Sequence, residues 1–213
     1  MVRDVRAALR AEDRDQGITL VELTISMFIA GLVAVMVAAT TIQAFRIQRE
    51  TTVRETDSTT ASLAMEQLSR DLRQAVAPQL ADGSSVPAFT VATPQRVSLV
   101  SWIGTDPVKV TYTVSNGVLT RAVQQPDAAG QGAKSKFTGS GTTTTATLAR
   151  AVTSTALFTY TLSDDEQTTG GTFTSTSDLG QVHSVKVDLT VDSDTSNELP
   201  GTTLQNSVTC LNL

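Results

Sequence analysis

One apolar, charge-free run near the amino terminus limits what this chain can fold into. From Leu23 to Phe45 there is no charged residue and no proline, and twenty of the twenty-eight residues from Ile18 to Phe45 are apolar. At a rise of about 1.5 Å per residue, such a run forms a helix long enough to cross a hydrocarbon core of about 30 Å. We therefore expect a membrane-spanning helix, and Glu22 is the single charge at its start.

The segment before this run argues against an ordinary secretory signal. Residues 1–17 are polar and hold four arginines and four acidic residues. A secretory signal instead has an apolar core of about 7–15 residues followed by a small-residue cleavage site. The run here is longer than that core, so a signal peptide removed as a whole is the disfavoured alternative.

Composition excludes several classes of functional site. The chain has 213 residues, a net charge of −5, one cysteine, one histidine and 4% aromatic residues. A single cysteine cannot form an internal disulfide or a cysteine-based zinc cluster, and a single histidine cannot build a multi-histidine metal site. The acidic balance and the few aromatics disfavour nucleic-acid binding. We expect no catalytic residue, no cofactor, no metal and no direct nucleic-acid partner.

The residues that open the apolar run form a recognisable motif, Gly17-Ile18-Thr19-Leu20-Val21-Glu22. It resembles the class III signal of type IV pilins and type II secretion pseudopilins, in which a polar leader ends in Gly and the fifth residue after it is Glu. The resemblance implies that a prepilin peptidase cuts between Gly17 and Ile18 and methylates the new amino terminus on Ile18. Most family members have Phe or Met where this chain has Ile18.

Glu22 has two interpretations. A carboxylate in an apolar span costs roughly 2.5–3.5 kcal/mol at the helix centre and less near the interface, so such residues usually have a partner. Glu22 is either an interfacial residue that reaches the lipid headgroups or an assembly residue that pairs with the amino terminus of a neighbouring subunit. In an apolar helix bundle a pair is tolerable where a lone charge is costly. The resemblance favours the assembly role.

The helix is expected to continue beyond the membrane. No proline occurs between Ile18 and Ala77, and Pro78 supplies the stop. A cluster of threonines between Thr51 and Thr60 lowers helix propensity and could break or bend the helix. We predict a leader over 1–17, a transmembrane or filament-core helix over 18–45 and an amphipathic half over 46–77. The apolar stripe of that half steps by four and three residues, through Ala61, Met65, Leu68, Leu72 and Ala75.

Residues 78–213 are predicted to form a β-rich head. Asn116-Gly117 lies between two β-branched runs and predicts a tight hairpin, because both central residues of a type I′ turn need positive φ. Gln124–Thr145 and Ser163–Gly180 are polar and are interpreted as connecting segments. The fold class is α+β, with the long amino-terminal helix packed on an antiparallel sheet. The strands are expected at Arg96–Ile103, Val108–Val114, Val118–Val123, Ala156–Leu162, Val182–Val191 and Ser207–Leu211.

The later strands also resemble one branch of the pilin family, the minor pilins and pseudopilins of the J or W type. The resemblance rests on a strand that ends in an acidic turn (Leu157–Asp165), a valine-rich strand (Val182–Val191) and a terminal strand (Ser207–Leu213). It covers most of the head, but its motifs have low specificity.

Four polar or reactive features have a structural interpretation. His183 lies in a strand without a nucleophile motif nearby, and Asp164-Asp165-Glu166 is an acidic turn. Asp192–Glu198 loosely resembles part of a calcium loop but lacks the glycine and the final glutamate of an EF-hand, so a solvated turn is favoured over calcium binding. Cys210 is interpreted as a small apolar residue on the last strand.

Two functions remain. The first is a minor pilin or pseudopilin in the cytoplasmic membrane, with an extracytoplasmic head, that enters a filament near its tip or at the start of assembly. Its implied partners are a prepilin peptidase, other pilin or pseudopilin subunits, an inner-membrane assembly platform and membrane lipid. The alternative is a single-pass membrane-anchored adhesin or substrate-binding module.

Overall fold

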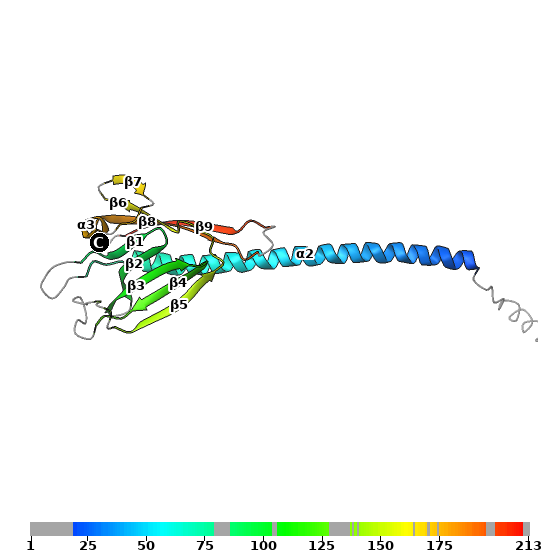
Figure 1. Cartoon of the computed structure of the whole chain (residues 1–213), viewed down its shortest axis with the longest axis horizontal. Coiled ribbons are helices and arrows are strands. Elements are labelled where there is room, and N and C mark those ends of the chain that lie inside the picture. Colours follow the sequence, from blue (N-terminus) through cyan, green and yellow to red (C-terminus); the bar gives the residue numbers. More distant parts are fainter. Residues whose placement is uncertain are drawn as a thin grey trace, which may run out of the picture. The chain divides into compact units, whose positions relative to one another are not determined.

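The computed structural model describes residues 19–78, 86–103, 106–127, 137, 139, 141–163, 165–169, 171–173, 175–194 and 199–210. The chain divides into two compact units, Met1–Arg49 and Glu50–Leu213. Helix α2 begins in the first unit and ends in the second, and the strands all belong to the second (Figure 1). The elements are α2 (Leu20–Arg73), β1 (Phe89–Thr93), β2 (Arg96–Ile103), β3 (Asp106–Ser115), β4 (Val118–Gln124), β5 (Thr143–Arg150), β6 (Phe158–Leu162), β7 (Asp165–Thr169), α3 (Thr176–Gly180), β8 (Val182–Val191) and β9 (Thr202–Thr209).

The first part of α2 keeps all its side chains exposed, from residue 19 to residue 52. Its threonine hydroxyls bond to the helix backbone: Thr24 donates to the carbonyl of Val21 at 2.8 Å, and Thr40 and Thr41 both donate to the carbonyl of Val37. The polar groups of these threonines are thereby satisfied inside the helix, as a segment surrounded by lipid requires. The threonine cluster, which the sequence marked as a place where the helix could break, does not interrupt α2, which runs as one helix from Leu20 to Arg73.

The last part of α2 buries the predicted stripe. Ala61, Leu68 and Leu72 are fully buried, and Met65 is 8% exposed. This stripe confirms the amphipathic period of the sequence. The helix ends at Arg73, four residues before the predicted end at Ala77.

The early end of α2 has a tertiary cause. The backbone after the helix pairs with β2: Val76 N–H donates to the carbonyl of Val100 at 2.9 Å, and Trp102 N–H donates to the carbonyl of Gln74 at 3.0 Å. Ala75 therefore lies in a bridge opposite Ser101, still fully buried but no longer helical. Two strand-type hydrogen bonds replace the last helical turn that local propensity favoured.

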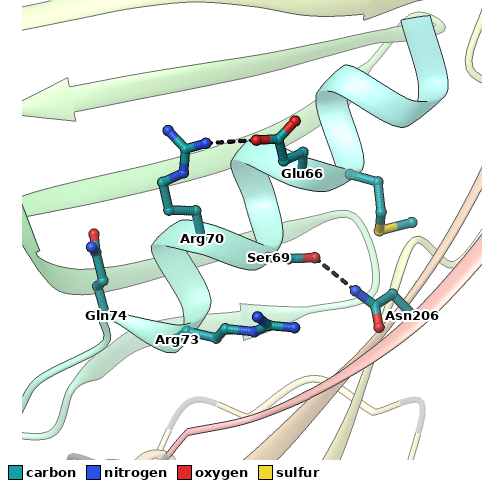
Figure 2. Close-up of a pocket in the computed structure, with 7 residues that line it drawn as sticks. Glu66, Ser69, Arg70, Arg73, Gln74 and Asn206 are labelled. Atoms are coloured by element: carbon teal, nitrogen blue, oxygen red, sulfur yellow. Dashed lines mark hydrogen bonds and ion pairs between the residues drawn. The ribbon is translucent and has the colours of Figure 1, made fainter. Parts of the chain in front are cut away.

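The strands form two antiparallel sheets. The first has the order β1-β2-β3-β4-β5 and the second has the order β7-β6-β8-β9. Strand β9 is thus an edge strand, and its Asn206 Nδ2 donates to Ser69 Oγ of α2 at 2.8 Å (Figure 2). The fold class is confirmed as α+β with a long amino-terminal helix and antiparallel strands, although the strands divide into two sheets.

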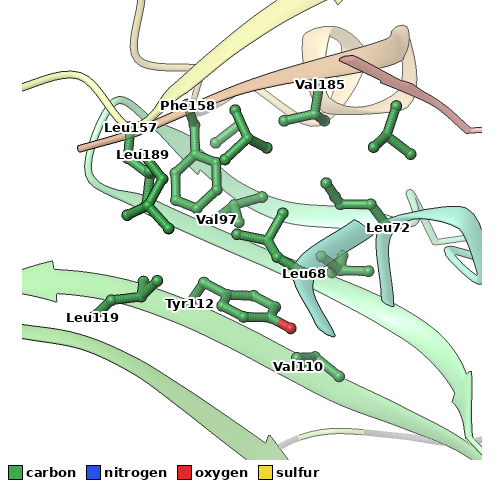
Figure 3. Packing of buried hydrophobic residues seen from close by; sticks show 14 of the residues in the cluster. Leu68, Leu72, Val97, Val110, Tyr112, Leu119, Leu157, Phe158, Val185 and Leu189 are labelled. Atoms are coloured by element: carbon green, nitrogen blue, oxygen red, sulfur yellow. The ribbon is translucent and has the colours of Figure 1, made fainter. Parts of the chain in front are cut away.

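A single apolar cluster joins α2 to both sheets. Figure 3 shows Leu68 and Leu72 of α2 near residues of the two sheets. The first sheet contributes Val97, Val110, Tyr112 and Leu119, and the second contributes Phe158, Val185 and Leu189, with Leu157 preceding β6.

The predicted hairpin between β3 and β4 is confirmed. Asn116 and Gly117 both have positive φ, at 51° and 70°, and Ser115 pairs with Val118 across the turn. This is the two-residue turn whose backbone twist suits a hairpin.

Three polar elements were not predicted, and a fourth was predicted with different bounds. Strand β5 begins at Thr143, inside the segment expected as a loop, and β7 and α3 lie inside the expected connector Ser163–Gly180. Strand β9 begins at Thr202, before the expected start at Ser207, and ends at Thr209. Leu211 to Leu213 lie outside the described residues. All four elements are polar in sequence or lie at sheet edges, where the alternation of apolar and polar residues is weak.

Candidate functional site: the amino-terminal motif and the contacts of the stalk helix

The amino-terminal motif is described from Thr19 onward. Gly17 and Ile18, the predicted cleavage and methylation residues, lie outside the described residues. Glu22 lies in the first turn of α2, and its side chain is exposed. A carboxylate at this place is favoured by the unpaired amides and the dipole of the helix start, by about 0.3–1 kcal/mol.

Thr19 caps the helix that carries Glu22. The backbone N–H of Glu22 donates to Thr19 Oγ1 at 3.2 Å, and the Thr19 carbonyl accepts the N–H of Leu23 at 3.0 Å. The spacing Thr-x-x-Glu is that of a capping box, so this local signal identifies Thr19 as the cap from the sequence. The cap fixes the helix start directly after the predicted cleavage site.

Glu22 forms no ion pair within the part of the chain that the structure describes. Large apolar side chains surround its position on the helix and are exposed, including Leu20, Val21 and Ile25. By length and composition, α2 is the one described helix that could cross a membrane, and its most apolar window is entirely exposed. The exposed apolar surface and the unpaired carboxylate therefore occur on the same segment.

A buried polar cluster attaches the other end of α2 to the first sheet. Asp71 is 1% exposed, and its Oδ2 accepts hydrogen bonds from Tyr112 Oη and from Arg121 Nε, each at 2.7 Å. Gln67 Nε2 donates to Asp71 Oδ1 at 3.1 Å. Three donors satisfy the buried carboxylate, so the cluster tolerates its charge.

The cluster changes the proton affinity of its members. Burial, followed by the charge and hydrogen bond of Asp71, raises the pKa of Tyr112 well above its usual range. Burial acts to lower the pKa of Arg121, but the hydrogen bond and charge of Asp71 outweigh it and raise that pKa. Both groups therefore stay protonated at neutral pH, which is the state in which they donate their two hydrogen bonds to Asp71.

Further contacts attach α2 to the second sheet. Asp57 is 4% exposed, and its Oδ2 accepts the backbone N–H of Ser193 at 3.1 Å, after the end of β8. Cys210 is 3% exposed, its thiol donates to the carbonyl of Leu72 at 3.4 Å, and burial raises its pKa to about 11. Cys210 is buried as expected, one residue after β9. Asp57 and Asp71 were not singled out from the sequence, because nothing local distinguishes a buried aspartate from a solvated one.

The other polar residues considered in the sequence do not gather into a site. His183 is exposed on β8, and the side chains of Asp165 and Glu166 lie outside the described residues, as does Asp164. Asp192 and Asp194 accept backbone hydrogen bonds from nearby residues: Asp194 N–H donates to Asp192 Oδ1 at 3.1 Å, and Leu199 N–H donates to Asp194 Oδ2 at 3.0 Å. Among the described residues, no three histidine, cysteine or acidic side chains are grouped so as to hold a metal.

Comparison with known proteins agrees with the amino-terminal motif. Residues 13–38 match the family described as the prokaryotic N-terminal methylation motif, and this confirms the recognition of a class III signal in the sequence. No protein of curated function matches the chain. The chain is similar to a chain in the crystal structure of the GspK-GspI-GspJ complex from the enterotoxigenic Escherichia coli type 2 secretion system, with 14% sequence identity, coverage of 72% of this chain and 96% of that chain, and a TM-score of 0.47.

These observations define the chain by its motif and its fold. The chain carries an amino-terminal methylation motif, a long apolar helix that begins within that motif, and a head of two antiparallel sheets held to the end of the same helix.

Proposed function

We propose that this chain is a minor pilin or pseudopilin, a structural subunit of a type IV pilus or of a type II secretion pseudopilus. The observation that carries the proposal is the methylation motif over residues 13–38, placed on a helix whose apolar side chains are all exposed up to residue 52. Exposed apolar residues on this scale need lipid or the helices of other subunits around them. The proposed role is structural rather than enzymatic.

In this proposal, the chain is first inserted into the cytoplasmic membrane. The helix of residues 18–45 crosses the lipid once, and the head lies on the extracytoplasmic side. A prepilin peptidase removes residues 1–17 by cutting between Gly17 and Ile18 and methylates the amine of Ile18. The Thr19 cap is compatible with this proposal, because the described helix starts at Leu20, only a few residues after the proposed cut.

In the proposed filament, Glu22 pairs with the amine of Ile18 of a neighbouring subunit. Glu22 is exposed and forms no ion pair in the described part of the chain, so its carboxylate is available to a partner. Inside a bundle of apolar helices, an unpaired carboxylate costs several kcal/mol, and a neighbouring amine offsets that cost. Pairing would therefore select processed and correctly staggered subunits.

Assembly also requires partners outside the filament. An inner-membrane assembly platform would extract the subunit from the lipid, and other pilin or pseudopilin subunits would receive it. We place the chain near the filament tip or at the start of assembly, because its large, polar, threonine-rich head is unlike a repeated packing unit.

A test of this function compares Glu22→Gln with Glu50→Gln in cells that assemble the filament. Both residues are exposed glutamates on α2, but only Glu22 lies in the methylation motif. We expect Glu22→Gln to insert into the membrane normally and to enter filaments about tenfold less, which corresponds to roughly 1.4 kcal/mol, and Glu50→Gln to assemble normally. Mass spectrometry of the filament should find a methylated chain that starts at Ile18. Normal assembly of Glu22→Gln, or filaments that retain Met1, would refute the proposal.

A further inference from the structure

Strand β9 presents an edge that is unpaired in the described part of the chain. It is the last strand of the order β7-β6-β8-β9, and among the described strands it pairs with β8 alone. The N–H of Cys210 donates to the carbonyl of His183 at 2.9 Å. In an antiparallel pair, the backbone groups of successive residues point alternately to the neighbouring strand and away from it, so this bond shows which residues of β9 face β8. The backbone groups of the even-numbered residues of β9 therefore point to β8. Those of Thr203, Gln205, Ser207 and Thr209 point away from the sheet, and no described group bonds to them.

The edge of β9 lacks the features that protect the other three sheet edges. Register irregularities interrupt the pairing of β1 with β2, of β5 with β4 and of β7 with β6, whereas β9 pairs with β8 over eight residues without a shift. The segment Thr202–Thr209 contains no proline and no charged residue. Bulges, charges and prolines are the usual means by which proteins keep an edge strand from pairing with another chain. The edge of β9 is open to such pairing.

A groove lies beside this edge. Its volume is about 490 Å³, and it is lined by Met65, Glu66, Ser69, Arg70, Arg73, Gln74 and Asn206 (Figure 2). The hydrogen bond between Asn206 and Ser69 attaches β9 to the helix along the groove. A strand placed beside β9 would therefore have this face of α2 beneath it, since neighbouring strands lie only about 4.8 Å apart.

The charge of the groove favours a carboxylate. Arg70 is paired with Glu66, with Nη2 and Oε1 at 2.6 Å, so these two charges offset each other. Arg73 extends toward the β9 side of the groove (Figure 2) and forms no ion pair in the described part of the chain. The groove thus has one uncompensated positive charge beneath the position of an added strand.

We propose that an extended segment of another protein adds to β9 as a fifth strand of this sheet, with a carboxylate side chain directed at Arg73. Backbone hydrogen bonds to the outward groups of β9 would supply affinity, and alternate side chains facing α2 would supply specificity. A second copy of this chain paired through its own β9 is a poorer occupant, because Thr202–Thr209 offers no carboxylate to Arg73. The inference uses only β9 and the last part of α2, and it does not depend on the proposed assembly role of Glu22.

The test uses the full chain in detergent micelles and a fluorescent ten-residue peptide of alternating threonine and glutamate. We expect the peptide to bind, to slow amide hydrogen exchange at Thr203, Gln205 and Ser207, and to bind at least about fivefold better than the matching threonine-lysine peptide. Replacing the two central peptide residues by proline should abolish binding, because proline cannot donate to the ladder.

Two variants make the test specific. Arg73→Glu should reverse the preference between the glutamate and lysine peptides, while Arg54→Glu, which changes another exposed arginine of α2, should not. Ser207→Pro should abolish binding by removing an outward N–H of β9. Protection of the Cys210 thiol against alkylation shows in each case that the head is folded.

Three outcomes would overturn the proposal. The first is no protection of β9 at about 1 mM peptide, the concentration of a weak but measurable complex. The second is equal binding of the two peptides together with an unchanged preference in Arg73→Glu. The third is protection of β9 that appears without peptide and grows with protein concentration, which would assign the edge to a second copy of this chain.

Discussion

Asp71 is the residue whose removal should most weaken the attachment of α2 to the first sheet. Its carboxylate accepts three hydrogen bonds and is 1% exposed. We expect Asp71→Ala to lower the free energy of unfolding by about 3–5 kcal/mol, because Arg121 and the hydroxyl of Tyr112 would lose their partner in a buried place. Denaturant unfolding monitored by circular dichroism measures this change.

The matched control for that prediction is Glu66→Ala. Glu66 also pairs with an arginine through α2, but the side chains of Glu66 and Arg70 are 65% and 57% exposed. Solvent screens such pairs, so we expect a loss of no more than about 1 kcal/mol. Equal losses in the two variants would show that the buried cluster does not hold the helix.

Alkaline pH should destabilise the head through three buried acids. Burial raises the pKa of Tyr112, of Tyr160 and, to about 11, of Cys210. The unfolded chain loses these protons at lower pH than the folded chain, so the stability that they contribute is complete below the unfolded pKa values and is lost as pH rises. The loss should begin above about pH 8.5 with the thiol and steepen above about pH 10 with the tyrosines.

Unfolding midpoints measured between pH 7 and pH 11 test this prediction. In Tyr112→Phe the decline above pH 10 should be shallower, although the variant starts from lower stability because Asp71 loses one donor. A slope identical to that of the natural chain would contradict the assignment to Tyr112.

At the scale of elements, α2 offers a direct comparison of a buried and an exposed leucine. Leu68 is fully buried in the cluster shared with both sheets, whereas Leu63, five residues earlier on the same helix, is 62% exposed. We expect Leu68→Ala to cost about 2–5 kcal/mol of unfolding free energy, through lost transfer and a residual cavity. Leu63→Ala should change it by less than about 0.5 kcal/mol. Thermal unfolding of the two variants decides whether the stripe holds the helix.

How well the elements could be predicted depended on where their side chains lie. The bounds of Arg96–Ile103 and Val182–Val191 agree with β2 and β8, because both are dense in β-branched residues and lie inside their sheets. Strand β5 could not be found, because six of its eight side chains are exposed and a polar edge strand has no apolar pattern. The end of α2 was misplaced because Ala75 and Val76 continue a helical pattern, and only pairing with β2 ends it.

The amino-terminal motif could be recognised from the sequence, but the contacts that attach α2 to the sheets could not. Gly17, Ile18 and Glu22 were named from a resemblance that a six-residue motif carries, and the matched motif over residues 13–38 spans all three positions. Their individual roles stay predictions. The attachment of α2 through Asp57, Asp71 and Ser69 joins residues that lie between 41 and 137 positions apart in sequence. No local pattern encodes such pairs, since a polar residue in a helix is exposed by default.

At the scale of the whole molecule, the residue at which the folded unit begins can be tested. The sequence predicted a head over 78–213 with the amphipathic helical half over 46–77 packed on it, and the compact unit of the structure is Glu50–Leu213. The helix contributes Ala61, Leu68 and Leu72 to the core with no exposed surface, and Asp57 is its first buried residue. No side chain from 19 to 52 is buried. The last part of α2 is therefore as much a part of the head as any strand.

We expect a fragment of residues 50–213 to fold without detergent and to unfold cooperatively, with a midpoint within a few degrees of the full chain in micelles. A fragment of residues 78–213 should show no cooperative transition, because losing three buried helix residues and the partner of Tyr112 and Arg121 removes about as much free energy as the roughly 5–15 kcal/mol that stabilises a typical domain. Cooperative unfolding of the shorter fragment would mean that the two sheets hold together without α2. Failure of the longer fragment alone would mean that the exposed apolar helix also stabilises the head.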